Sequence, residues 1–327
     1  MRALEKRLGG CKPPLLDAKS RASIDARLWC RILSRRHLDK LANIKIGTCA
    51  WSYEDWRGVF YPEHLPAGER LEFYARHLPA VEVDSTFYHA PTPQVAAHWA
   101  EETPADFAFT CKLSREITHE RKLRDCAGPL QEFLEPLQSL GAKLWCVLVQ
   151  LPPFFQPARD ETALRDFVRH LPKDVRFAIE FRHADWHHPR IAHLLTEHGV
   201  AWAWNDLTSH EHQEEGAFEF LPDTTDFLYV RLMGDLEKKY DTSGHRIHHY
   251  RELLWPRDEA LESWAVRVRQ AAAEHRRIFI AVSNHYEGFA PHTARRLGER
   301  LGFAFPSPDE SRSSEEAAGD GQQMRLL

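Results

Sequence analysis

The stretch Phe177-Ala178-Ile179-Glu180-Phe181-Arg182-His183-Ala184-Asp185-Trp186 begins as an apolar run of strand-forming residues and ends in charge. If the run is a β-strand, successive side chains alternate between its two faces. Ala178, Glu180 and Arg182 then share one face, and bulky apolar side chains share the other. Such a strand suits a closed parallel barrel, whose bulky face packs on helices and whose charged face lies at the mouth. A buried Glu–Arg ion pair that only closes the barrel is the alternative interpretation.

The same rhythm of β-prone runs and helical patterns extends in both directions from this stretch. Strands are predicted at 44–49, 81–86, 107–112, 144–151, 176–182, 200–205, 227–232 and 278–284. Helices are predicted at 69–77, 93–101, 126–140, 161–170, 189–198, 257–275 and 291–301, with no convincing long helix after the sixth strand. This order predicts an α/β fold, a single (β/α)8 TIM-type barrel with long loops at its C-terminal face. A doubly wound sheet would also alternate strands and helices, but it has no reason to stop at eight strands. A dinucleotide-binding fold is disfavoured because no Gly-x-Gly-x-x-Gly follows a strand.

The barrel is predicted to occupy residues 44–306, between two segments of different composition. Residues 1–43 contain eleven Lys or Arg against four Asp or Glu, which predicts a basic N-terminal extension. A targeting segment and a mis-assigned start codon are alternatives for this extension. Residues 307–327 are rich in Ser, Glu, Gly and Gln, which predicts an acidic, disordered tail.

Composition excludes several classes of protein. The 327 residues are 43% hydrophobic and have a net charge of −5. No apolar run approaches the ~20 residues of a membrane helix, and the first residues lack the apolar core of a secretory signal. The cysteines form no Cys-x-x-Cys pair. We therefore expect a cytoplasmic protein with free thiols and no membrane partner, and the acidic barrel argues against nucleic acid as a partner.

Polar side chains gather where the predicted strands end, so they should meet at one rim of the barrel. The residues expected there are Glu82, Asp84, Lys112, Gln150, Glu180, Arg182, Asn205, Asp206, Tyr229, Arg231, Asn284 and His285. The chemistry of TIM barrels takes place at this rim. Any one of these residues has a structural explanation, but their coincidence over seven strands predicts a functional site.

Long loops are predicted on the same side, and loops of this length are typical of lids and binding loops. The loop after the first strand contains Trp51 and Tyr53, which could stack on a sugar or a base. The loop after the third strand contains His119 and Arg121, and the loop after the seventh contains several Lys and His. The alternative for the aromatic residues is a second hydrophobic cluster over the mouth.

Several multi-residue motifs occur in a characteristic order. They are Ile46-Gly47-Thr48-Cys49-Ala50-Trp51-Ser52-Tyr53, Trp56-Arg57-Gly58-Val59-Phe60-Tyr61-Pro62, Val81-Glu82-Val83-Asp84-Ser85-Thr86-Phe87-Tyr88, Ile117-Thr118-His119-Glu120, Gln150-Leu151-Pro152-Pro153, Glu180-Phe181-Arg182-His183 and Asn284-His285-Tyr286-Glu287-Gly288-Phe289-Ala290-Pro291. In these motifs the chain resembles the YecE-like family, the domain of unknown function number seventy-two. The resemblance covers roughly residues 44–302. It implies a TIM-like barrel with a polar mouth and no settled activity. The family usually has Asn at the position of Asp84, and the extra carboxylate could favour a cation or change a substrate contact.

The function we expect is that of an enzyme using acid/base chemistry on a small polar or anionic molecule at the mouth. The predicted catalytic residues are Glu180 as acid or base, Arg182 as its orienting partner, and His119. The predicted substrate-binding residues are Trp51, Tyr53, Asp84, Tyr88, Lys112, Arg121, Gln150, Arg231, Asn284 and His285. No cofactor is predicted.

Two other functions stay open. A metal-dependent isomerase or hydrolase would bind a divalent metal through Asp84, Glu180, Asp206 and His285. A non-catalytic nucleotide or nucleic-acid binder would use the aromatic loop and the basic extension. Metal analysis of the purified protein and salt-dependent retention on nucleic acid separate these functions.

Overall fold

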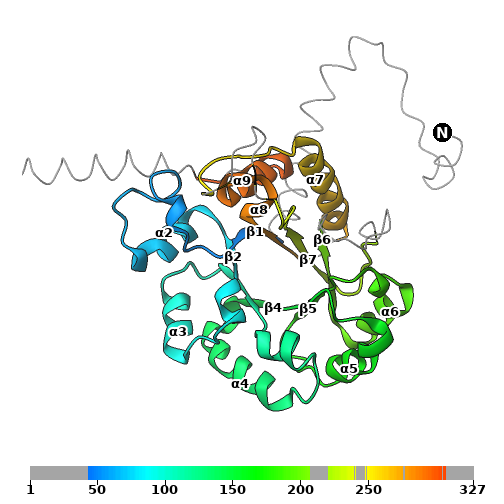
Figure 1. Ribbon diagram of the computed structural model, residues 1–327. Coiled ribbons are helices and arrows are strands. Elements are labelled where there is room, and N and C mark those ends of the chain that lie inside the picture. The colour runs from blue at the N-terminus through cyan, green and yellow to red at the C-terminus, as the bar shows by residue number, and fades with distance from the viewer. Residues whose placement is uncertain are drawn as a thin grey trace, which may run out of the picture. The chain divides into compact units, whose positions relative to one another are not determined.

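The computed structural model describes residues 43–206, 220–238, 240, 247, 249–274, 277–303 and 305–306. In this part of the chain, eight parallel strands close into a barrel in sequence order (Figure 1). They are β1 (Ile44–Cys49), β2 (Ala80–Val83), β3 (Ala108–Lys112), β4 (Leu144–Gln150), β5 (Phe177–Glu180), β6 (Ala201–Asn205), β7 (Phe227–Leu232) and β8 (Arg277–Val282). The predicted (β/α)8 barrel is therefore confirmed.

Helices surround the barrel, as Figure 1 shows along the barrel axis. They are α2 (Arg70–His77), α3 (Pro93–Glu101), α4 (Ala127–Leu137), α5 (Pro157–Arg169), α6 (Pro189–His198), α7 (Asp258–Ala273), α8 (Asn284–Glu287) and α9 (Ala290–Leu301). Several begin with proline in the first turn, where its fixed φ suits the helix and its missing N–H costs nothing. At α3, the hydroxyl of Thr92 also accepts a hydrogen bond from the backbone N–H of Val95 at 3.3 Å.

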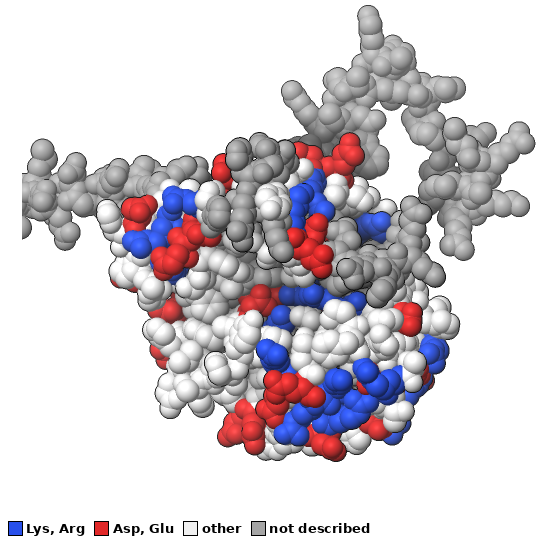
Figure 2. Space-filling model, in the orientation of Figure 1, with Lys and Arg blue, Asp and Glu red and all other residues white. Residues whose placement is uncertain are grey.

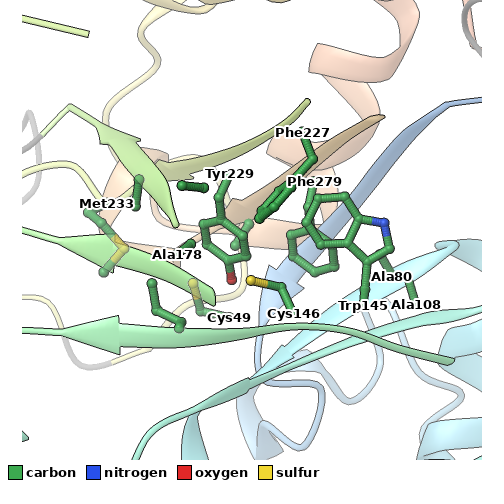
Figure 3. Packing of buried hydrophobic residues seen from close by; sticks show 14 residues of the cluster. Cys49, Ala80, Ala108, Trp145, Cys146, Ala178, Phe227, Tyr229, Met233 and Phe279 are labelled. Carbon is green, nitrogen blue, oxygen red and sulfur yellow. The ribbon is translucent and has the colours of Figure 1, made fainter. Parts of the chain in front are cut away.

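The barrel interior is filled by pairing small and large side chains. Alanines of β2, β3, β5 and β6 face inward and leave room for the rings of Trp145, Phe227, Tyr229 and Phe279. Tyr229 and Phe279 stack in parallel, with ring centroids 5.2 Å apart (Figure 3). The N-terminal and middle parts of the barrel interior thus form a packed apolar core. The C-terminal ends of the strands are left for polar groups.

Three predicted site residues lie beyond the strands to which the sequence pattern assigned them. β2 ends at Val83, and Asp84 begins a 3-10 turn that extends to Phe87. The hydroxyl of Thr86 donates to the backbone oxygen of Val83 at 2.7 Å, which favours this turn over a longer strand. β5 ends at Glu180 rather than Arg182, and Asn284 begins α8 rather than ending β8.

The aromatic residues of the first long loop divide into two groups. Trp56, Phe60 and Tyr61 are buried and pack edge to face on one another and on α2, so the alternative of a second hydrophobic cluster holds for them. Trp51 and Tyr53 are half-buried.

Several predictions lie wholly or partly outside the described residues. These are the extension 1–42, the tail 307–327, the segment 207–219 after β6 and part of the loop after β7. In the described chain, no helix is long and apolar enough to cross a membrane. The described cysteines are free, as expected, and they are also buried.

Candidate functional site at the barrel mouth

Arg231 of β7 is the centre of a charged cluster at the C-terminal ends of the strands. Its Nε and Nη2 donate to Glu82 of β2 at 2.9 and 2.6 Å, and its Nη1 donates to Glu180 of β5 at 2.5 Å. All three side chains are almost completely buried. Burial opposes the charge of Arg231, but the two carboxylates outweigh it and hold its pKa above the ordinary value.

Glu180 lies between two guanidinium groups. Its second carboxylate oxygen accepts a hydrogen bond from Nε of Arg182 at 2.5 Å. Burial alone would raise the pKa of Glu180, but Arg182 and Arg231 outweigh burial and lower it to about 2. A carboxylate with this pKa and both oxygens engaged is a poor proton carrier at neutral pH. Its expected role as acid or base therefore loses support, and its surroundings fit the alternative interpretation of a structural ion pair.

Glu82 and Tyr229 belong to the cluster; both were expected at the rim, but neither was predicted to be a catalytic or substrate-binding residue. The Tyr229 hydroxyl donates to Glu82 at 2.5 Å. Burial would raise the pKa of Glu82, yet Arg231 and this hydroxyl hold it below the ordinary value. The alternation of side chains along each strand could have identified both residues as inward-facing. Glu82 lies on the same face of β2 as Ala80, and Tyr229 lies on the same face of β7 as Arg231, two residues further on.

Asp84 differs from the other described carboxyl groups of the mouth in having a raised pKa together with a buried oxygen that lacks a hydrogen-bond partner. Its Oδ1 atom is buried without a hydrogen-bond partner, 3.7 Å from Nζ of Lys112 and 4.0 Å from Nη2 of Arg231. About a third of the side chain, 32%, remains open to solvent. Burial and the negative charge of Glu82 raise its pKa to about 6, against the opposing effect of the two cations.

Lys112 and Arg182 line the same region and retain unused donors. Nζ of Lys112 lies 4.4 Å from the ring centroid of Phe87, and its ion-pair partner is Asp84. Burial and the neighbouring Arg231 lower the pKa of Lys112, although Asp84 acts in the other direction. Among the described residues, Arg182 makes a hydrogen bond only through Nε. Figure 2 shows basic and acidic side chains next to each other near the centre of this face.

His119 lies beside these cations on the π-helical turn Glu116–Glu120. Its Nδ1 is 2.8 Å from the hydroxyl of Thr118, and its ring contacts Phe87 edge to face at 5.0 Å. Burial, followed by the charge of Lys112, lowers the pKa of His119 to about 4. The imidazole is therefore neutral at physiological pH and can exchange hydrogen bonds with a ligand.

The aromatic and basic residues of the loops lie around this cluster rather than inside it. Tyr53 packs on Trp56, and its pKa is raised by burial and then by nearby acidic groups that include Asp84. Trp51 packs edge to face on Trp99, with ring centroids 5.5 Å apart. Arg121 pairs with Glu116 at 2.8 Å. Tyr88 is exposed and contacts Phe87 edge to face.

The remaining predicted residues are engaged with neighbouring backbone or with other loops. Gln150 donates to the backbone oxygen of Leu151 at 3.1 Å. The Asn284 side-chain oxygen accepts from the N–H of Ala290, while its buried Nδ2 has no partner. His285 lies 3.3 Å from the Tyr250 hydroxyl.

The four residues of the predicted metal site do not form one group. Asp206 accepts hydrogen bonds from the backbone of Met233 and Gly234 and pairs with Arg257 at 3.2 Å. The potential ligands that do come within 4.8 Å of one another in the described chain are Cys49, Glu82 and Asp84. This second set is a poor fit for a cation, because both oxygens of Glu82 already bind Arg231.

The closed barrel and its charged upper end define a TIM-barrel protein with a polar mouth. The family described as "Protein of unknown function DUF72" matches residues 45–317, so the chain belongs to the DUF72 family. The resemblance inferred from the sequence motifs is thereby confirmed.

Relatives and solved structures agree with this assignment. The chain is 35% identical over 140 residues to "UPF0759 protein YecE" of Escherichia coli K12, covering 43% of this chain and 48% of that relative, so it spans about half of YecE. It is 24% identical to "UPF0759 protein YunF" of Bacillus subtilis, covering 80% of this chain and 96% of that relative. A crystal structure of a DUF72 family protein from Thermotoga maritima matches with a TM-score of 0.64 and 25% identity, covering 80% of this chain and 99% of that chain. None of these names specifies an activity.

Proposed function

We propose that this protein is an enzyme that binds a small anionic molecule at the barrel mouth and moves a proton through Asp84. The observation that carries the proposal is the state of Asp84. Its carboxyl group has a pKa of about 6, and its buried Oδ1 has no hydrogen-bond partner. A carboxyl group with this pKa exists in both protonation states near neutral pH, as a general acid or base requires.

The charge of the cluster supports an anion as the ligand. Arg182 and Arg231 pair with the ionised carboxylates of Glu82 and Glu180, and Lys112 pairs with Asp84. When Asp84 is protonated, the cations exceed the anions by one charge, and a bound anion restores the balance. Lys112 and Arg182 have donors available for it, and a charge-assisted hydrogen bond in a partly buried site is strong.

The proposal changes the role that the sequence assigned to Glu180. With Glu82, this residue fixes Arg231 and Arg182 in position before the ligand arrives, which is electrostatic preorganisation rather than proton transfer. His119 stays neutral and is proposed as a hydrogen-bonding partner of the ligand. Because the family resemblance expects Asn at position 84, we propose proton transfer by Asp84 for this chain and not for its relatives.

The other candidate functions have less support. A metal-dependent reaction would need ligands that the described cluster already uses for Arg231. Nucleic acid remains disfavoured by the charge of the barrel. We propose the cytoplasm as the location, on the sequence arguments alone.

Anion binding can be tested before a substrate is known. Titration with inorganic phosphate and with acetate, followed by calorimetry, should show binding to the wild type that Lys112→Met weakens about tenfold or more. Lys45→Met is the matched control, because Lys45 is at the N-terminal end of the barrel and pairs with Asp106. Equal weakening by both substitutions, or no binding to the wild type, would overturn the anion site.

Proton transfer requires a reaction to follow. Once a panel of small phosphates and carboxylates yields a turned-over compound, Asp84→Asn should reduce kcat by ~10² or more without weakening binding of the compound, because a neutral amide at position 84 leaves the excess positive charge of the cluster in place. The wild-type rate should also change with a midpoint near pH 6, as the pKa of Asp84 requires. A variant with undiminished turnover would exclude Asp84 as the proton carrier.

A further inference from the structure

A cavity of about 760 Å³ lies beside the mouth, between the residues that follow β2 and the π-helical turn that follows β3. Its lining includes Phe87, Tyr88, Arg115, Arg121 and Phe133. This volume is within the range of ~300–1,000 Å³ that is usual for small-molecule sites. Its position makes it a candidate for the part of a ligand that the charged cluster does not bind.

The cavity shares a wall with the proposed anion site. Phe87 lines the cavity, and its ring also contacts Nζ of Lys112 at 4.4 Å and the imidazole of His119 at 5.0 Å. The Tyr88 ring centroid is 5.2 Å from that of Phe87, so it lies within about 10 Å of Nζ of Lys112. Lys112 itself is not part of the cavity lining, so a small molecule with one end at Lys112 and the other at Tyr88 has to pass over the shared Phe87 ring.

Tyr88 offers an unusually open aromatic surface. It is 68% exposed, and its described ring contact is edge-on, with an interplanar angle of 84° to Phe87. Its backbone N–H donates to the oxygen of Ser85 at 3.1 Å, which fixes the residue at the end of the 3-10 turn. A tyrosine side chain has only two torsions, so its ring can stack on a flat partner with little loss of conformational entropy.

The rim of the cavity does not call for a second charge on the ligand. Arg121 pairs with Glu116 at 2.8 Å, and Arg115 pairs with Glu120 at 3.5 Å. Both arginines of the lining are thus balanced by carboxylates, and Glu132, which also lines the cavity, leaves the rim with one more acidic than basic side chain. An uncharged ring fits these surroundings better than a second anionic group.

Building on the function proposed above, we propose that the ligand is an aryl anion, an aromatic ring with a phosphate or carboxylate substituent. The anionic group lies at Lys112, and the ring stacks against Tyr88 in the cavity. Tyr88 thus determines specificity, whereas Lys112 binds the group common to all the ligands.

Matched pairs of probes test this inference. Phenyl phosphate has an aromatic ring where methyl phosphate has a methyl group, and both carry the same anionic group. Benzoate and acetate form a second pair of this kind. In at least one pair, the wild type should bind the aryl compound about 5- to 10-fold more tightly, which is typical of one aromatic stacking contact. Tyr88→Ala should abolish this preference without changing the affinity for the methyl compound, and Tyr88→Phe should retain it.

Phe154→Ala is the matched control. Phe154 is 49% exposed and contacts His119 from outside the cavity lining, with ring centroids 6.2 Å apart. Phe154→Ala should keep the preference for the aryl compound. If Phe154→Ala loses this preference and Tyr88→Ala keeps it, the assignment of the ligand ring to the cavity is overturned. Equal affinity for both members of each pair would overturn the aryl inference while leaving the anion site intact. No binding of any probe, including inorganic phosphate, would refute the proposed function as well.

Discussion

The guanidinium of Arg231 and the carboxylate of Glu82 form a bidentate ion pair across the barrel, from β7 to β2. The third nitrogen of Arg231 binds Glu180 of β5, so one buried cation ties three strands together. Such an ion pair gives little net stability relative to apolar packing, but removal of one partner leaves a buried charge uncompensated. The cluster is thus both the proposed preorganised part of the site and its most vulnerable structural point.

Glu180→Gln should destabilise the fold strongly, because Arg231 and Arg182 both lose an ionised partner. Breaking a buried pair of this kind costs ~3–5 kcal/mol in the free energy of unfolding. Denaturant unfolding at pH 7 measures this loss. Glu72→Gln is the control, since it removes an exposed partner of Arg76 on α2 and should cost under about 1 kcal/mol.

The pH dependence of the stability difference between wild type and Glu180→Gln tests whether the ionised carboxylate of Glu180 is its cause. The folded pKa of Glu180 is lowered to about 2, below the ~4.3 of an unfolded glutamate. Its contribution is therefore complete above pH ~4.3 and disappears as the pH falls towards 2. The difference between wild type and Glu180→Gln should shrink over this interval. A small, pH-independent difference would return Glu180 to the role of a solvated catalytic group.

The position of the strands was predictable from the sequence because each is a short run, rich in apolar and β-prone residues, in regular alternation with helical patterns. β1 and β7 agree with the predicted residues. The ends of β2 and β5 were not predictable to the residue, because side-chain hydrogen bonds and pairing with a neighbour end them. The direction of Arg182 therefore depends on the turn after β5 and not on strand alternation.

The partners within the site could not be predicted from sequence alone. Glu82 and Arg231 are 149 residues apart, and only closure of the barrel brings them together. The pKa order of the carboxyl groups depends on this closure. Glu180 receives two cations and stays ionised, while Asp84 lies beside Glu82 and gains protons more easily. Residue type and strand alternation located the charged cluster, but three-dimensional contacts set the pKa of each of its carboxyl groups.

A chain truncated to residues 41–306 should fold cooperatively. The first barrel strand begins at Ile44, and the backbone oxygen of Asn43 accepts a hydrogen bond from Ile278 at 2.9 Å. The last helix, α9, ends at Leu301. A single thermal transition within a few degrees of the full-length value is expected from circular dichroism. Insolubility of the truncated chain beside a soluble full chain would show that the removed segments belong to the core.

Gly234→Ala should destabilise the loops that follow β7 and β8. Gly234 has φ of 68°, and an added Cβ would lie 2.3 Å from the backbone oxygen of His285. The backbone must therefore move, at a cost of ~3 kcal/mol or more, and the hydrogen bond from Gly234 to Asp206 should weaken. Gly199→Ala is a close control because φ is 69° and the space is open, so only ~1 kcal/mol of backbone strain is expected. Equal losses in denaturant unfolding would contradict the steric explanation.

Asp84→Asn should change how stability depends on pH, in a direction opposite to Glu180. The folded pKa of Asp84 is raised to about 6, above the ~3.9 of an unfolded aspartate, so the folded state binds more protons between these values. Stability therefore falls as the pH rises from about 4 to 6. Because a neutral amide avoids this loss, the variant should be more stable than wild type at pH 7 by on the order of 1 kcal/mol, after allowance for solvent screening. Unfolding free energies at several pH values between 4 and 7 measure this change.

Asp206 also has a raised pKa of about 6, so part of the decrease in stability with rising pH should persist in Asp84→Asn. Asp106→Asn is the control of opposite sign, because Lys45 lowers the pKa of Asp106. Parallel pH profiles for wild type and Asp84→Asn would mean that Asp84 titrates like an ordinary surface aspartate, and the proposed proton carrier would be lost.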